Sequence, residues 1–170
     1  MSCSVALKSC SEPAPKMALI NDAELFDIPS FFDKEITLLK GANPKILKSV
    51  SKDHQSEEKL MHIESWDNEL SSFKTIDLRK GVYKGFVKKD SIDNMVTYTF
   101  QNDDVDSSKV KIGYKDGSAF QIVIERRVNN LLYDTQEILS YTVGENYTVE
   151  KIQDVWILGE NKYRINGIFQ

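Results

Sequence analysis

Apolar residues recur at helical spacing near the start of the chain and predict an amphipathic helix there. The stripe, with steps of four, four and three residues, consists of Ile28, Phe32, Ile36 and Leu39. Asp27 is a suitable N-cap, and Pro29 falls in the first turn, where its missing N–H is not needed. Gly41 followed by Pro44 is typical of a helix end. We therefore expect a helix over 28–40.

The hydrophobic period changes after this helix. Residues 45–64 alternate between apolar and polar positions on both sides of the segment "KDHQSEE", which predicts a β-hairpin with a polar loop. The stretch "SWDNELSSFKTIDL" returns to helical spacing, with Ser65 as N-cap and with Trp66, Leu70 and Phe73 on one face. A second helix is expected here.

From residue 81 onward the pattern indicates strands. Segments such as "NMVTYTFQN", "KVKIGYK" and "SAFQIVIERRV" alternate with period two, and Asp116-Gly117 is a two-residue hairpin turn. Seven strands joined by tight turns can only form an antiparallel meander.

The separation of helices from strands along the chain predicts the α+β class. We expect a helix–hairpin–helix unit followed by a seven-stranded antiparallel meander, which forms a curved sheet or half-barrel with the helices packed on one face. Residues 24–170 are expected to form a single domain, and residues 1–23 a flexible tether that is a signal remnant.

Composition narrows the classes of partner. The chain has 170 residues, 41% of them hydrophobic, which suits one globular domain. Its net charge of -4 argues against a nucleic-acid partner, because such proteins need a basic surface. No stretch approaches 18 consecutive apolar residues, so no membrane-spanning helix is expected.

Both cysteines lie before the first predicted element. Leu7-Lys8-Ser9-Cys10 resembles the acylation site of bacterial lipoproteins, and an acidic, proline-containing segment follows it. Lys8 departs from the pattern, and no apolar signal segment precedes it. We expect a lipid-anchored protein acylated at Cys10, or at Cys3 if Met1-Ser2-Cys3 is the end of a truncated site. The alternative is a ragged terminus with Met17 as the true start.

Two resemblances point to the cell envelope. The order of helices and strands resembles that of the LolA-like envelope lipoprotein carriers, a similarity at the level of the fold. The stretches "FDIPSFFDKEITLL", "WDNELSSFKTIDL" and "NLLYDTQEILSYTVGENYTVEKIQ" resemble a family of uncharacterised lipoproteins from Bacteroidetes. This resemblance covers about residues 24 to 170 and implies a location on the periplasmic face of the inner or outer membrane. It implies no activity and no catalytic residues.

The sequence holds no pattern that indicates an enzyme, a cofactor or a metal site. His54 and His62 lack the spacing of metal ligands. The acidic segment "QNDDVDSS" lacks the glycine and glutamate of a calcium-binding loop. We interpret these residues as surface groups.

Two hypotheses for function follow. In the first, the protein binds a lipid or another hydrophobic small molecule between sheet and helices. The ligand would contact aromatic side chains expected on the inward faces, namely Phe32, Trp66, Phe73, Tyr98, Phe100 and Phe120. One of Arg126 and Arg127 points inward and either binds an anionic head group or pairs with a helix acid such as Glu35 or Asp67. In the second hypothesis those side chains fill the core, and the protein is a non-catalytic accessory that acts through its surface.

Overall fold

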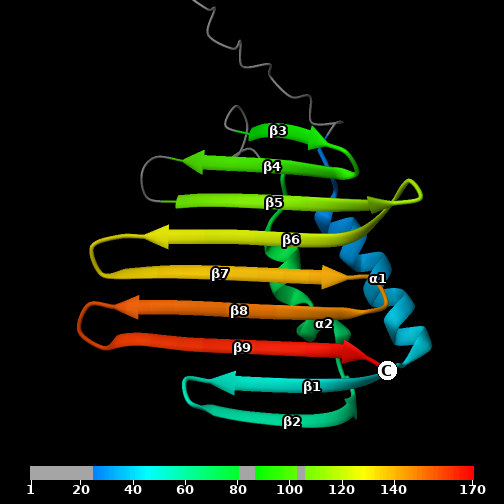
Figure 1. Ribbon diagram of the computed structural model, residues 1–170, viewed down its shortest axis with the longest axis horizontal. Helices are drawn as coiled ribbons and strands as arrows, with labels where there is room; N and C mark the ends of the chain where they lie inside the picture. The colour runs from blue at the N-terminus through cyan, green and yellow to red at the C-terminus, as the bar shows by residue number, and fades with distance from the viewer. Residues whose placement is uncertain (1–24, 81–86, 103–105) are drawn as a thin grey trace, which may run out of the picture.

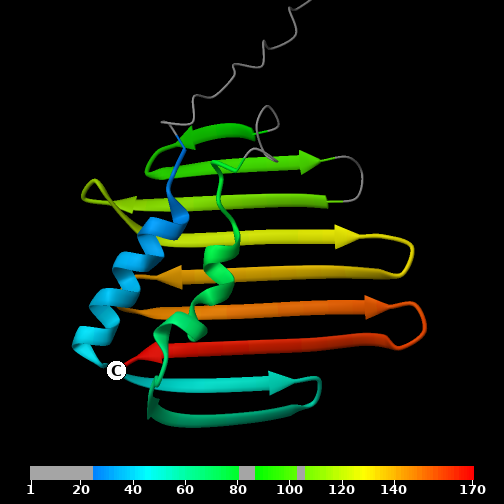
Figure 2. The same cartoon turned by 180° about the vertical axis from the view of Figure 1, so that it is seen from behind.

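The computed structural model describes residues 25–80, 87–102 and 106–170, and within these ranges nine strands form one open antiparallel sheet. The helical segments lie together on one face of the sheet, and the other face carries none of them (Figures 1 and 2). The strands are β1 (Lys45–Lys52), β2 (Gln55–His62), β3 (Val87–Ile92), β4 (Met95–Asn102), β5 (Asp106–Lys115), β6 (Ser118–Asn129), β7 (Tyr133–Thr142), β8 (Asn146–Val155) and β9 (Gly159–Phe169). The α+β class predicted from the sequence is confirmed.

The sequence predicted a seven-stranded sheet with a separate hairpin. This is wrong in one respect, because the hairpin is part of the sheet, which therefore has nine strands. Their order is β2-β1-β9-β8-β7-β6-β5-β4-β3. The predicted hairpin, β1 and β2, joins the meander because β1 pairs with the last strand, β9, from Ile46 opposite Phe169 to Lys52 opposite Tyr163. The sheet is therefore continuous from β2 to β3, and these two strands are its edges.

Helix α1 (Ile28–Ala42) begins where the sequence predicts. The Asp27 carboxylate accepts a hydrogen bond from the Ser30 backbone N–H at 3.1 Å. The helix continues through Gly41 and ends at Ala42, and its C-cap Asn43 adopts the left-handed conformation with φ 44°. Its backbone N–H donates to the Leu39 carbonyl at 2.8 Å, a capping bond that Asn as well as Gly can make.

The second predicted helix is divided into two short pieces. α2 (Trp66–Glu69) begins at its predicted cap, Ser65, and η2 (Ser71–Thr75) is a 3₁₀-helix. The Ser71 hydroxyl donates to the Asn68 carbonyl, and the Thr75 hydroxyl donates to the Ser72 carbonyl, each at 2.8 Å. Such local side-chain bonds compete with a regular helix.

The hydrophobic core lies between the helical segments and the sheet. The apolar stripe of α1 is buried, as are Trp66, Leu70 and Phe73 from the second helical segment. The sheet contributes buried side chains from β1 and from β4 to β8. They are Ile46, Tyr98, Phe100, Val110, Ile112, Ile122, Ile124, Leu139, Tyr141, Tyr147 and Val149.

Two buried tyrosines connect the sheet to the helices through their hydroxyl groups. Tyr141 donates to the Glu35 carboxylate of α1, and Tyr147 donates to the Glu69 carboxylate of α2, each at 2.7 Å. Glu69 also accepts a hydrogen bond from Lys48 of β1 at 2.7 Å. Burial, together with the neighbouring carboxylate, raises the pKa of both tyrosines above the usual value of 10.0.

These tyrosines predict a loss of stability in alkali. Above about pH 10 an unfolded tyrosine ionises, whereas the folded one keeps its proton, so the unfolded state is favoured as the pH rises. Above about pH 10, each tyrosine should lower the free energy of unfolding by about 1–1.5 kcal/mol per pH unit. Below about pH 10, the stabilisation by each buried tyrosine is fully present. Urea unfolding at a series of pH values, compared between wild type and the Tyr141→Phe/Tyr147→Phe variant, measures this slope. An equally steep alkaline slope in that variant would show that other groups cause it.

Candidate functional site

Five of the aromatic residues that the sequence places inward are buried in the core. Phe32 of α1 lies against Phe73 of η2, with ring centroids 4.8 Å apart. Trp66 stacks on Phe169 of β9 at 5.9 Å and meets the edge of Tyr147 at 6.2 Å. Tyr98 and Phe100 belong to the same hydrophobic cluster. These rings therefore pack against protein side chains.

Phe120 differs from its predicted position. The pairing of β5 with β6 shifts register at Gly113 and Tyr114, so one residue of β6 has no partner on β5. A β-bulge of this kind changes which side of the sheet the following side chains occupy. Ile112 and Tyr114 pack into the core, so the Cβ position of Gly113, which lies between them in the strand, faces the helix-free side. The Phe120 ring lies beside this Cβ position, so Phe120 is on the helix-free face.

The two adjacent arginines of β6 point to opposite faces, as expected, but they pair differently. Arg127 donates to Asp134 of β7 through two hydrogen bonds of 3.1 and 2.6 Å. The predicted partners are engaged elsewhere, because Glu35 accepts from Tyr141 and Asp67 forms an ion pair with Lys40. Arg126 is half-buried and lies opposite Glu137, and it forms no ion pair within the described ranges. The predicted pairing of an arginine with a helix acid is therefore wrong.

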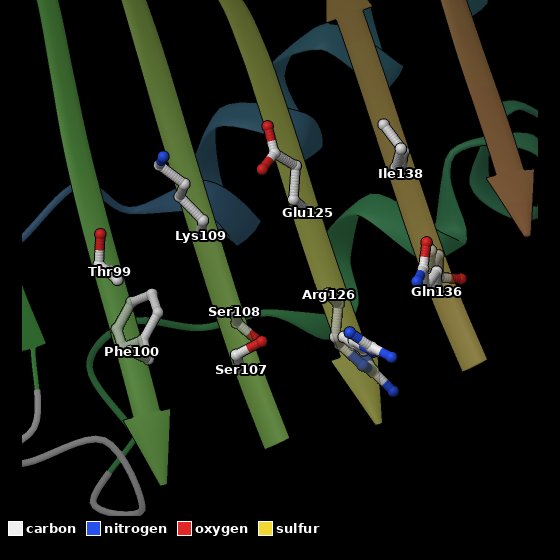
Figure 3. A pocket seen from close by; sticks show the side chains of 11 residues that line it. Thr99, Phe100, Ser107, Ser108, Lys109, Glu125, Arg126, Gln136 and Ile138 are labelled. Atoms are coloured by element: carbon white, nitrogen blue, oxygen red, sulfur yellow. The ribbon is translucent and has the colours of Figure 1, made fainter. Parts of the chain in front are cut away.

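A shallow hollow of about 340 Å³ lies across β4 to β7. Figure 3 views it with the helices behind the sheet, and Lys109, Glu125 and Ile138 lie side by side on neighbouring strands. Glu125 is bonded to Lys111 at 2.5 Å. With Arg127 held by Asp134, two of the charged groups here could act as acid, base or ligand only by breaking an ion pair.

The remaining predictions concern acylation, metal binding and membrane-spanning helices. Cys3 and Cys10, the predicted acylation sites, lie outside the described residues. Among the residues that the structure describes, no group of three or more His, Cys, Asp or Glu side chains could hold a metal ion. In the same ranges, no helix has both the length and the hydropathy needed to cross a membrane.

Two hairpin loops at one end of the sheet form an exposed apolar surface. The loop between β6 and β7 carries Leu131 and Leu132, and the loop between β8 and β9 carries Trp156, Ile157 and Leu158. We call these five residues the hairpin tips. Leu131 is 96% exposed, Ile157 86% and Trp156 83%, values that large apolar side chains rarely reach in a cluster.

The two loops form one surface. β7 and β8 are neighbours in the sheet, so both hairpins end side by side, beyond the part of the sheet that the helices cover (Figures 1 and 2). The Trp156 backbone N–H donates to the Leu132 carbonyl at 3.2 Å, which joins the loops directly. A hollow of about 560 Å³ lies between them, lined partly by Leu131, Leu132 and Trp156.

The charges at the base of the hairpin tips are largely paired. The Arg127 guanidinium hydrogen-bonds the Asp134 carboxylate and holds the pKa of Asp134 below its usual value. On the other hairpin Lys162 and Glu160 form an exposed ion pair at 3.1 Å. The tips therefore combine an apolar end with a collar of mixed charge.

Pattern reasoning overlooked this surface, although the sequence contains a signal for it. The apolar residues of "YTVEKIQDVWIL" favour a strand up to Leu158, but β8 ends at Val155 and residues 156–158 form the turn. Four successive apolar residues from Val155 to Leu158 break the alternation of a half-buried strand, immediately before Gly159. Turns are usually polar, so an apolar run in this position indicates an exposed hydrophobic loop.

Searches of protein-family models, curated proteins and solved structures give no match to this chain. The resemblances to envelope lipoproteins and to LolA-like carriers therefore stay predictions from the sequence.

Proposed function

We propose that this protein is a non-catalytic interaction protein of the cell envelope and that the hairpin tips are its binding surface. The observation that carries the proposal is the gathering of five large, exposed apolar side chains on two hydrogen-bonded loops. Water-exposed apolar clusters of this kind are typical of interaction sites, because covering them is favourable.

The packing of the core supports a surface function over a ligand held between sheet and helices. Phe32, Trp66 and Phe73, which would line such a ligand site, are each no more than 2% exposed and contact other rings. A ligand there would have to displace these contacts, at the cost of their packing.

The envelope location rests on the sequence around Cys10. Radiolabelled palmitate should enter the full-length protein when it is expressed in its own host, because Leu7-Lys8-Ser9-Cys10 resembles a lipoprotein acylation site. Label should be lost when Cys3 and Cys10 are both changed to Ser. Label that persists in this variant would contradict the lipid anchor.

Site-specific photocrosslinking tests the binding surface. A photoreactive amino acid placed at Ile157 should form adducts in the host, whereas the same group at Lys115, an exposed residue at the β5–β6 turn on the opposite end of the sheet, should form few. Adducts with either protein or lipid at position 157 support the proposal. Equal or absent crosslinking at the two positions would overturn it.

A further inference from the structure

The hairpin tips have a geometry that suits one kind of partner. They are short, adjacent loops that project from the end of the sheet, and none of the described helices lies over them (Figure 2). A protein partner would need a complementary cavity for such projecting side chains, whereas a lipid surface adapts to them. We propose that the hairpin tips insert into the interfacial region of a lipid bilayer, an inference that rests on the proposed function and names its partner.

The side chains at the tips are of the type that enters this region. Trp156 offers a large apolar ring with one polar N–H, a combination favoured at the boundary between head groups and acyl chains. Leu131, Leu132, Ile157 and Leu158 add purely apolar surface, and none of the five residues is charged. Tyr133, at the base of the first loop, is partly exposed and also amphipathic.

Several backbone N–H groups at the tips are hydrogen-bonded within the protein. A loop that enters lipid must satisfy its polar backbone groups internally, because the surroundings offer few partners. The Asn130 side-chain oxygen accepts from the N–H groups of Leu132 and Tyr133, at 2.9 and 3.0 Å. The N–H groups of Asn130, Trp156 and Leu158 donate to the carbonyls of Tyr133, Leu132 and Val155.

The charges around the tips indicate whether binding to a bilayer needs anionic lipid. Binding to anionic membranes usually uses clustered basic residues. Here the cations nearest to the loops, Arg127 and Lys162, are each paired with an acid on the same hairpin region. The apolar side chains, rather than the charge, should therefore provide the affinity, and a zwitterionic bilayer should be sufficient.

Trp156 itself can report the insertion. In the full chain with Trp66→Phe, and with Cys3 and Cys10 changed to Ser to exclude acylation, Trp156 is the single tryptophan. Adding phosphatidylcholine vesicles should shift its emission to shorter wavelengths, and lipids brominated on the acyl chain should quench it. Vesicles that also contain phosphatidylglycerol should give a similar affinity.

A tip variant and a control variant each replace two exposed aliphatic side chains with serine. Leu131→Ser/Ile157→Ser should weaken vesicle binding at least about tenfold, since burial of such side chains provides the affinity. Leu38→Ser/Ile92→Ser, which changes residues that are 65% and 66% exposed elsewhere, should bind like the parent.

Several results would overturn the inference. They are the absence of a shift with either vesicle, equal binding by the tip variant, and binding that requires the anionic lipid. A shift that grows with protein concentration without lipid would instead show self-association through the tips. That result, or a protein adduct at position 157 without vesicle binding, would overturn the bilayer inference but leave the proposed function intact. Failure of both vesicle binding and crosslinking would remove both.

Discussion

Replacing Trp66 with alanine should lower the free energy of unfolding by about 3–5 kcal/mol, the usual cost of truncating a buried aromatic side chain. Trp66 is 2% exposed and contacts both Phe169 and Tyr147, so its removal leaves a cavity between α2 and the sheet. The melting temperature should fall by roughly 6–20 °C for a domain of this size. Urea or thermal unfolding measures the change.

The second tryptophan provides the control. Trp156→Ala removes a ring of the same size from a side chain that is 83% exposed, so stability should change by no more than about 0.5 kcal/mol. Trp66→Phe should be tolerated much better than Trp66→Ala, because it keeps an aromatic ring and removes a buried indole N–H that has no acceptor among the described residues. Equal effects of Trp66→Ala and Trp156→Ala would contradict the placement of Trp66 in the core.

Substituting Gly167 by alanine should destabilise the protein by about 3 kcal/mol, at the upper end of the usual cost of overpacking. Gly167 lies opposite Tyr147 in the pairing of β9 with β8, and a Cβ atom at this position would overlap the Tyr147 ring. The ring cannot move freely, because its hydroxyl is bonded to Glu69 and the ring packs against Trp66. Equilibrium unfolding in urea gives the change.

Gly41→Ala is the matched substitution. Gly41 lies within α1 and has open space around its Cβ position, so alanine there should stabilise the helix by about 0.5–1 kcal/mol. Tyr147→Leu removes the ring that the new Cβ atom would overlap, so Gly167→Ala should lower the free energy of unfolding less in this background than in the wild type. A double-mutant cycle measures this difference. Independent, additive effects of the two substitutions would contradict the overlap.

Local signals in the sequence predicted the elements well, and contacts between distant residues account for most of the differences. The apolar stripe and the Asp27 cap are local features, and both are confirmed. The pairing of β1 with β9 joins Ile46 to Phe169, and no local pattern specifies which strand a free hairpin edge will meet. The sheet therefore has nine strands where the sequence predicted seven.

The same distinction explains the candidate site. The inward position of Phe32, Trp66 and Phe73 followed from helical spacing, and the structure buries all three. Phe120 could not be placed from alternation alone, because a bulge opposite Gly113 changes the period. The hairpin tips were missed for another reason: an apolar run resembles a strand until the turn residues on both sides are located.

One measurement tests the central claim, a packed interior with an apolar binding surface at the hairpin tips, most directly. It is acrylamide quenching of each tryptophan alone, Trp66 in a Trp156→Phe variant and Trp156 in a Trp66→Phe variant. We expect Trp66 to emit at short wavelength and to be almost protected from the quencher, and Trp156 to be quenched nearly as strongly as free tryptophan. Strong quenching of Trp66, or protection of Trp156 in the lipid-free monomer, would contradict the account.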